Sequence, residues 1–556
     1  MNNRSSVLFF ALPLALFSVV VAILLNLLLH KTGGRLIYVI DDPYIHLSIA
    51  RHLVEHGVWG VSIDHFTNTS SSPLWTLLLA PFMFFPSFAE KGPLILNLAA
   101  VLLLVIVLWN AAQRAGLKGP VSAGFLFSVL FLTPLFIVVF TGMEHVLHTL
   151  LVMLFAFKWA DTQGGFRSGF LRTLLVVCLV LTRVESLFVI AAAVILLFDS
   201  SKGKRFMTVA MTAALPLLVL GVFSLMHGGL FFPNSVALKG NALGISSVTL
   251  LQFLGKALKQ VLCAPHLLGL MVISLAIRLL DRKKVIALSP ASKGLHFLFL
   301  ASSVLHLLFA QVGWFYRYEA YLMVLGFSAI FLSFPEWEPF FRNLSVKGAH
   351  RTRAILFSAL VVLLLSGRAI IGATGIPLSA KNIYEQQYQI GLFLRQCESG
   401  RSVVLNDIGA ASFLGNVHVI DLWGLGHDEI ARMRKNWRFR VADLEQIISR
   451  ENGTIAVVYD DLFFDTDVFK FAKPFFGHLP FLWFLKPYFI KYGIGVVPGH
   501  WIKVAEWEIT DNIVCESGQV SFYAFDPPAA GQLLRALKGF EADLPKDVVK
   551  TYYRTE

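Results

Sequence analysis

Two adjacent carboxylates, Asp41 and Asp42, begin the stretch DDPYIHLSIARHLVEHG, shortly after the apolar segment VLFFALPLALFSVVVAILLNLLL. Adjacent like charges repel each other, and the dipole at the C-terminal end of a helix also disfavours a carboxylate. A site that takes a proton from a hydroxyl group can use one carboxylate as general base and a second group to orient it. We interpret the pair as the base and the orienting residue of an outward-facing site, in which either acid could be the base.

Further polar side chains lie at the outer ends of the predicted membrane spans. Ionisable groups at membrane depth usually line a cavity or a pathway, and Arg and Lys can hold a phosphate. Structural alternatives stay open: ion pairs for Arg183 with Glu185 and for Arg317 with Glu319, a helix cap for Glu144, and a turn for Asn234. The pocket candidates are His46, Arg51, His65, Asn68, Glu144, Glu185 and Asn234, and the phosphate candidates are Arg183, Lys239 and Arg317.

The composition predicts a polytopic membrane protein with helical spans. The chain has 556 residues, of which 56% are hydrophobic and 15% are charged, whereas soluble domains are about one quarter charged. Apolar runs of about 20 residues recur through the first two thirds of the chain. The net charge of +12 does not favour nucleic-acid binding, because Lys and Arg lie mostly in short connections, as the positive-inside rule predicts.

We predict about eleven spans, with the N-terminus inside and the C-terminus outside, and an uncleaved first span. The outer loop 30–92 is expected to carry an interfacial helix, PLWTLLLAPFMFF, which is too short to cross the bilayer. Together these segments form a predicted transmembrane domain, 1–373. The predicted spans are 7–29, 93–112, 121–140, 146–160, 173–181, 187–198, 206–226, 262–280, 295–313, 319–334 and 354–373.

Residues 374–556 are predicted to form a separate extracytoplasmic α/β domain, because the apolar runs shorten there to strand length. The predicted strands are SVVLN, VHVIDL, TIAVVYDD, WIKVAEWEI and VSFYAF. Cys397 and Cys515 could form a disulfide or remain thiols, and the cysteines show no metal-binding spacing. Candidates for stacking on a sugar, or alternatively for the core, are Trp423, Trp437, Trp483, Trp501 and Trp507.

Five stretches, in this order, resemble motifs of the GT-C fold glycosyltransferases, and the closest likeness is to the branch that contains terminal arabinofuranosyltransferases. The likeness covers about residues 7–435. Val184, Ser186 and Ser235 depart from the residues usual in that branch, which leaves the donor sugar open. The stretches are DDPYIHLSIARHLVEHG with FTNTSSSPLWTLLLAP, TGMEHVLHTLL, LTRVES, HGGLFFPNSVALKG, and LNDIGAASFLGNVHVIDLWGLGHDEIA.

The resemblance implies inverting transfer of a sugar from a polyprenyl-phosphate carrier to an envelope glycan or glycolipid, on the outer face of a bacterial inner membrane. Asp41 would match the catalytic acid, with Asp42 in support, and Arg183 and Lys239 would hold the donor phosphate. The sequence has no motif that demands a cofactor or a metal, although a divalent cation is compatible with the site. The alternative is a transporter or flippase of lipid-linked sugars, which would need polar residues in mid-span and at the inner ends.

Overall fold

A computed structural model describes residues 3–160, 166–196, 203–239, 247–343, 349–436, 438–463 and 495–554. The chain divides into two compact units, each assembled from three segments. The helical unit comprises Met1–Leu27, Pro93–Val219 and Gly240–Ile376, and the α/β unit comprises Leu28–Gly92, Leu220–Lys239 and Pro377–Glu556. The α/β unit therefore joins the first predicted outer loop and the 220–239 segment to the C-terminal part of the chain.

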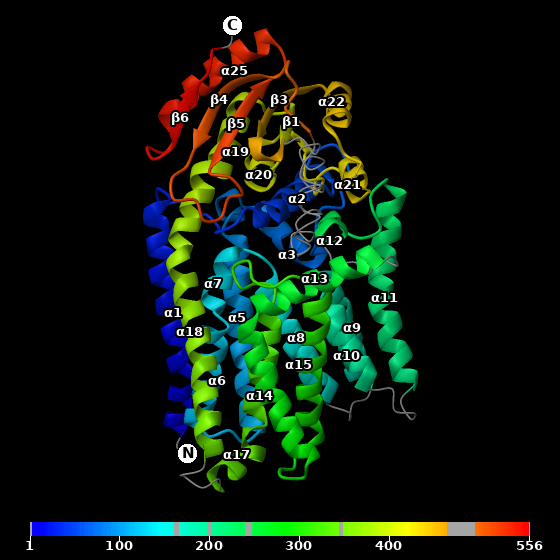
Figure 1. The fold of residues 1–556 in the computed structure, drawn as a ribbon, viewed down its shortest axis with the longest axis vertical. Coiled ribbons are helices and arrows are strands. Elements are labelled where there is room, and N and C mark those ends of the chain that lie inside the picture. Colours follow the sequence, from blue (N-terminus) through cyan, green and yellow to red (C-terminus); the bar gives the residue numbers. More distant parts are fainter. Residues whose placement is uncertain are drawn as a thin grey trace, which may run out of the picture. The chain divides into compact units, whose positions relative to one another are not determined.

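Apolar helices make up the helical unit (Figure 1). Three of its boundaries fall inside long helices, because α1, α11 and α18 continue into segments of the other unit. Its elements are α1 (Asn3–Lys31), α5 (Gly92–Arg114), α6 (Gly119–Phe127), η1 (Ser128–Leu132), α7 (Leu135–Val138), η2 (Val139–Thr141), α8 (His145–Ala160), α9 (Phe166–Thr182), α10 (Ser186–Leu196), α11 (Gly203–Met226), α13 (Ser247–Cys263), α14 (Pro265–Arg282), α15 (Pro290–Phe309), α16 (Ala320–Leu332), α17 (Phe334–Asn343) and α18 (Ala349–Ile383).

Within the described residues, five helices are long and apolar enough to cross a membrane, and up to eight candidates result if each bent pair counts as one span. The bent pairs are Gly119–Leu132 with Leu135–Thr141, Phe253–Cys263 with Pro265–Arg282, and Ala320–Leu332 with Phe334–Phe340. Several helices of this length and composition are typical of a multi-pass membrane protein. The total of about eleven spans and their orientation remain predictions.

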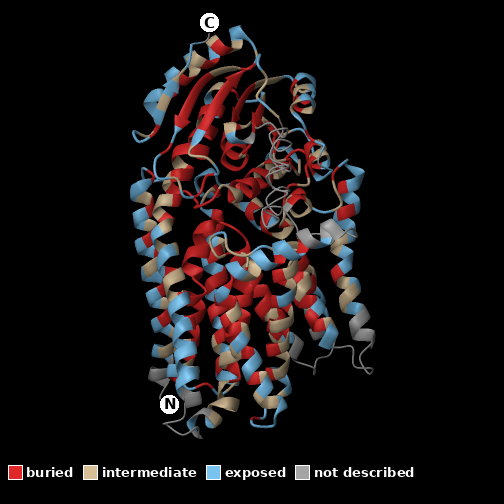
Figure 2. Cartoon of the chain, viewed as in Figure 1, coloured by how far each residue is buried: buried red, intermediate tan, exposed pale blue. Residues whose placement is uncertain are grey.

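The surfaces of three long helices suit contact with lipid. The most apolar windows of α1, α11 and α18 are only 22%, 22% and 17% buried, and Figure 2 shows exposed residues along their length. In contrast, α16 is buried along almost all of its length. A helix that is apolar on all sides packs inside a bundle when it is buried and faces hydrocarbon when it is exposed.

The α/β unit combines short helices with a mixed sheet (Figure 1). Every segment that we expected as a strand contains one, since β-branched residues favour the extended chain. Its elements are α2 (Asp42–His56), α3 (Pro73–Met83), α4 (Pro86–Ala89), α12 (Asn234–Lys239), η3 (Tyr384–Tyr388), α19 (Gln389–Cys397), β1 (Ser402–Leu405), α20 (Gly409–Gly415), β2 (His418–Asp421), α21 (Asp428–Lys435), α22 (Val441–Arg450), β3 (Gly453–Val458), η4 (Asp460–Leu462), β4 (Ile502–Glu508), β5 (Gln519–Ala524), α25 (Pro527–Phe540), η6 (Glu541–Asp543) and β6 (Val549–Tyr552).

Among the described residues the sheet has the strand order β2-β1-β3-β5-β4-β6. Strand β1 pairs in parallel with β2 and β3, whereas β5, β4 and β6 add antiparallel pairs. The carboxyl ends of β1, β2 and β3 therefore lie along one edge of the sheet, and their amino ends lie along the opposite edge. This polarity separates the two polar sites described below.

The tryptophans of the α/β unit serve mainly its core. Trp507 is fully buried, and its ring centroid lies 4.5 Å from that of Phe522. Trp501 is also buried, against Tyr523 and Phe525. For these two residues the sugar-stacking hypothesis was wrong, because an indole inside the core presents no face to a ligand. Trp423 lies beneath the Arg434 guanidinium, at 5.2 Å; Trp437 and Trp483 fall outside the described residues.

Cys397 and Cys515 are free thiols. The Cys515 side chain is buried, and its Sγ lies 3.3 Å from Gln387 Oε1, to which it donates. Burial raises the pKa of the Cys515 thiol. Of the two alternatives left open by the sequence, the structure has the thiols.

Candidate functional site

Asp41 is held by two backbone amides from the far end of the chain. Its Oδ2 accepts from the Gly409 N–H at 2.6 Å and its Oδ1 accepts from the Ala410 N–H at 2.8 Å. Gly409 and Ala410 begin α20, which follows β1. The first N–H groups of a helix have no partner within the helix, and a carboxylate satisfies them and complements the dipole. Asp41 therefore has a fixed orientation at the carboxyl edge of the parallel strands.

Close packing at Gly409 explains why a glycine follows Ile408. A Cβ added at Gly409 would lie 2.2 Å from the Asp41 carbonyl oxygen and 2.6 Å from its Cγ. Any larger residue would therefore push the start of α20 away from Asp41. This requirement for a missing side chain is visible only in the folded unit.

Asp407, two residues before Gly409, provides a second acid next to this arrangement. Its Oδ2 accepts from Tyr459 Oη at 2.5 Å and from Gln387 Nε2 at 2.9 Å. Burial, followed by the charge of Asp407, raises the pKa of Asp41 to about 8, although the Gly409 and Ala410 amides act in the opposite direction. A carboxyl group with a pKa near neutrality is suited to proton transfer.

Asp42 has a different position. It is the first residue of α2 and is followed by Pro43, which is well tolerated in a first helical turn. An acid there is favoured by the positive end of the helix dipole. Asp41 is therefore held by the first amides of α20, whereas Asp42 begins α2. Both residues are partly exposed.

Three other predicted pocket residues have structural partners. His46 is buried, with its Nδ1 2.8 Å from Thr76 Oγ1, and this contact joins α2 to α3. The Arg51 guanidinium lies 5.4 Å from the Phe413 ring centroid, and its Nε lies 3.7 Å from Glu55. His65 Nδ1 lies 2.7 Å from Asp64 Oδ1 at the rim of a cavity.

Asn68 and Asn234 are brought together by a residue that sequence reasoning did not single out, Asp428. The Asn234 Nδ2 donates to Asp428 Oδ1 at 2.6 Å and to the Leu425 carbonyl at 3.1 Å. The Asn68 backbone N–H donates to the same Asp428 oxygen at 3.4 Å, and its carbonyl accepts from the Asn234 N–H. Asn234 is therefore more than a turn residue, because it joins three distant segments. The side chain of Lys239 lies outside the described residues.

Arg183 forms the central ion pair of the helical unit. Its Nη1 lies 2.5 Å from Glu144 Oε1, and its Nη2 lies 2.5 Å from Glu185 Oε1. The Arg183 Nε also donates to Glu185 at 3.0 Å, which makes a bidentate contact. The structure thus joins three of the predicted residues in one buried cluster, and a donor phosphate would compete there with two carboxylates.

Arg317 is also buried in the helical unit, and its Nη2 donates to Tyr318 Oη at 3.0 Å. Glu319, which the sequence offered as an alternative ion-pair partner for Arg317, contacts Arg368 and His266. The preceding Gly313, Trp314, Phe315 and Tyr316 all have positive φ angles. Left-handed backbone is unfavourable for such side chains, so neighbouring contacts must hold this turn, among them the Arg368 guanidinium 4.2 Å from the Tyr316 ring.

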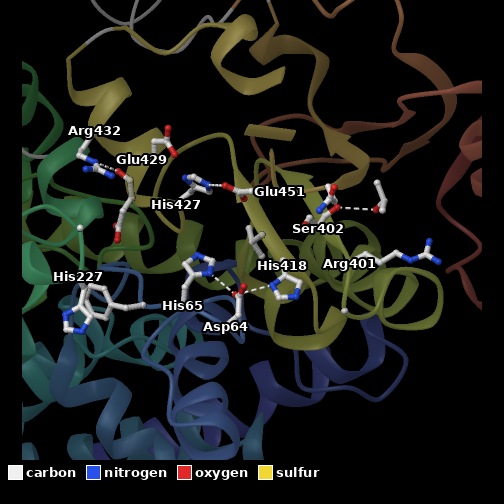
Figure 3. A pocket seen from close by; sticks show the side chains of 17 residues that line it. Asp64, His65, His227, Arg401, Ser402, His418, His427, Glu429, Arg432 and Glu451 are labelled. Carbon is white, nitrogen blue, oxygen red and sulfur yellow. Dashed lines mark hydrogen bonds and ion pairs between the residues drawn. The ribbon is translucent and has the colours of Figure 1, made fainter. Parts of the chain in front are cut away.

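A cavity of about 870 Å³ lies within the α/β unit (Figure 3). It is lined by the amino ends of β1, β2 and β3, by the start of α21, and by the loops around residues 65 and 227. Of the predicted site residues it contains His65, and neither Asp41 nor Asp42 lines it. The polar string GLGHDE before α21 is the signal by which sequence reasoning could have found this cavity. No group of three His, Cys, Asp or Glu that could hold a metal is found in the part of the chain that the structure describes.

Comparisons with known proteins give partial likenesses. Residues 381–523 match the model of a family described as a domain of unknown function, DUF8728, and a search of the curated proteins finds no match. The crystal structure of ArnT from Cupriavidus metallidurans bound to undecaprenyl phosphate aligns over 94% of this chain and 98% of that chain, with a TM-score of 0.48 and 14% identity. The Archaeoglobus fulgidus oligosaccharyltransferase, in complex with Zn and sulfate, aligns over 96% of this chain and 74% of that chain, with a TM-score of 0.47 and 12% identity. At these scores the chain is similar to these proteins without being assigned to their family.

Proposed function

We propose that the chain is a GT-C-type membrane glycosyltransferase, which transfers a sugar from a polyprenyl-phosphate donor to an envelope glycan or glycolipid on the outer face of a bacterial inner membrane. The observation that carries the proposal is the contact of Asp41 with the Gly409 and Ala410 amides. It joins the acidic stretch DDPYIHLSIARHLVEHG to the stretch LNDIGAASFLG, two segments that resemble the same family although they lie far apart in the sequence.

The other family-like segments also converge, which supports the proposal. FTNTSSS, PNSVALKG and GLGHDEIA join in the α/β unit through Asn68, Asn234 and Asp428. TGMEH and LTRVES join in the helical unit through Glu144, Arg183 and Glu185. Segments that share only a chance similarity would have no reason to converge inside the fold.

In this proposal Asp41 is the general base and Asp42 supports it. Each Asp41 oxygen accepts one backbone N–H and keeps a second lone pair for the acceptor hydroxyl. Asp41 takes the hydroxyl proton, the acceptor oxygen attacks the anomeric carbon, and the bond from that carbon to the phosphate oxygen breaks with inversion. Arg183, Lys239 and Arg317 are the proposed contacts of the departing phosphate, because guanidinium and ammonium groups stabilise its charge.

The experiment compares wild type with Asp41→Asn and Asp42→Asn in nanodiscs. Each protein is incubated with a panel of polyprenyl-phosphate sugars and extracted envelope glycolipids, and donor loss is followed by mass spectrometry. We expect wild-type turnover, its loss by at least 100-fold in Asp41→Asn with donor binding retained, and a smaller loss in Asp42→Asn. Donor binding without turnover in wild type, unchanged by either substitution, would instead support a transporter or flippase of lipid-linked sugars.

A further inference from the structure

The cavity of the α/β unit lies at the edge of the sheet opposite to Asp41. Ser402 and His418, which line it, are the first residues of β1 and β2, whereas Asp41 contacts the helix that follows the last residue of β1. A four-residue strand spans about 10 Å from its first to its last Cα. The cavity is therefore a second polar site of the unit, separate from the acid pair.

The carboxylates around the cavity are already paired. Asp64 Oδ1 lies 2.7 Å from His65 Nδ1 and 3.1 Å from His418 Nδ1, as Figure 3 shows. On the other side, Glu451 Oε1 lies 3.1 Å from His427 Nε2 (Figure 3) and 3.0 Å from Arg450 Nη2. Among the other lining acids, Asp428 accepts from Asn234 and Glu429 pairs with Arg450. The guanidinium groups of Arg401 and Arg432 line the cavity as well. Acids, guanidinium groups and imidazoles are thus interspersed, and the lining presents oriented donors and acceptors. This pattern suits neutral hydroxyl groups better than a phosphate or a cation.

The cavity also has one apolar side. The Phe66 ring centroid lies 5.2 Å from that of His227, and both residues line the cavity. The C–H face of a sugar ring packs against rings of this kind, while its hydroxyls reach polar side chains. The volume of about 870 Å³ lies within the range of roughly 300–1,000 Å³ that holds ligands of a few linked rings.

We propose that this cavity binds a neutral saccharide segment of two to four residues. The identification of this saccharide as part of the acceptor glycan rests on the proposed function. The binding of a saccharide in the cavity does not depend on it. A binding site away from the acid pair would hold an acceptor chain by sugars that do not react. Asp428 lines the cavity and accepts from Asn234, so a bound saccharide would touch the residue that joins the loops at Asn68 and Asn234.

The test measures binding of free oligosaccharides to the full chain in nanodiscs, without any donor. The probes are neutral arabinan, mannan, galactan and glucan fragments of two to four residues. The variants are His418→Ala, which removes a lining imidazole, and Ser402→Leu, which narrows the cavity at the amino end of β1 and leaves its ion pairs intact. The matched control is His500→Ala, since His500 is 62% exposed, pairs with Glu445 and does not line the cavity.

We expect saturable binding of at least one fragment class to wild type and to His500→Ala, weakened at least tenfold in His418→Ala and Ser402→Leu with unchanged melting temperatures. The absence of binding by any fragment, or equal binding by wild type and Ser402→Leu, would overturn the proposal. With an active donor, the same variants should raise KM for a glycan acceptor with little change in kcat. Failure of transfer would leave the donor-free binding result intact, so the two proposals can fail separately.

Discussion

The acids around Arg183 in the helical unit and around Asp41 in the α/β unit are satisfied in different ways. In the helical unit, Glu144 and Glu185 contact the side chain of Arg183, and Glu319 contacts the side chains of Arg368 and His266. In the α/β unit, Asp41 accepts from two backbone amides, and Asp421 accepts from the Trp423 and Gly426 amides.

This difference has a chemical consequence. A guanidinium cancels the charge of the acid beside it, and in the membrane-spanning part such pairing reduces the penalty of burying both charges. Backbone amides orient a carboxyl group without placing a cation beside it, and each oxygen keeps a free lone pair. The cluster around Arg183 therefore holds charges together, whereas the arrangement around Asp41 presents one oriented carboxyl group.

The largest expected effect is that of Arg183→Met. The substitution leaves Glu144, which is fully buried, and Glu185 without their cation, and breaking such a pair costs about 3–5 kcal/mol. We expect a large drop in the melting temperature of the protein in nanodiscs. The control is Arg450→Met on the exposed pair with Glu429, where we expect a loss below about 1 kcal/mol. Equal losses in the two variants would contradict the comparison.

A smaller effect is expected for Gly409→Ala, which disturbs the two backbone amides, of Gly409 and Ala410, that hold the Asp41 carboxyl group. The new Cβ would lie 2.2 Å from the Asp41 carbonyl oxygen, so α20 must move and its two hydrogen bonds to the carboxylate weaken. We expect a destabilisation of about 2–3 kcal/mol together with loss of donor turnover. Gly539→Ala is the matched control, because its Cβ would meet nothing within 4 Å and alanine is favoured inside a helix. Normal turnover in Gly409→Ala would show that these two amides do not position the base.

The pH dependence of stability tests the state of Asp41. Burial and Asp407 raise its pKa to about 8 in the folded protein, from about 3.9 in an unfolded chain. The contribution of Asp41 to stability is then fully present below about pH 4 and is lost as the pH rises toward 8, because the unfolded state releases this proton first. Turnover should rise over the upper part of this range, since the base must be deprotonated.

Urea unfolding of wild type and Asp41→Asn between pH 5 and 9 measures this effect. Wild type should lose stability with rising pH relative to Asp41→Asn, which has no proton to release at this position. The same slope in both proteins would mean that Asp41 is not the titrating group.

The smallest effect is expected for the contact of Asn234 with Asp428, at 2.6 Å. In a double-mutant cycle with Asn234→Ala and Asp428→Ala we expect a coupling energy of about 1 kcal/mol, because the two residues are direct neighbours. Unfolding of the two single variants and the double variant gives the value. A coupling near zero would mean that the three loops are held together by other contacts.

Sequence patterns alone predicted much of the fold. Long apolar runs predicted the helices because a helix satisfies its own backbone hydrogen bonds, whatever surrounds it. Short β-branched runs such as SVVL and IAVV predicted strands of the sheet. The pairing of Arg183 with Glu185 could be foreseen because the two residues are close neighbours in the chain. Asp41 and Asn234 could be selected as candidates because they are polar residues at the ends of apolar segments.

Only the tertiary structure decided which distant residues complete these sites. The partners of Asp41 are backbone amides at Gly409 and Ala410, and a backbone amide has no residue type by which a sequence could reveal it. Asp428 and Arg368 became relevant only when folding brought them to Asn234 and Glu319. The sequence specifies where charged and polar groups can be placed along the chain, but which of them meet depends on contacts between segments that are far apart in it.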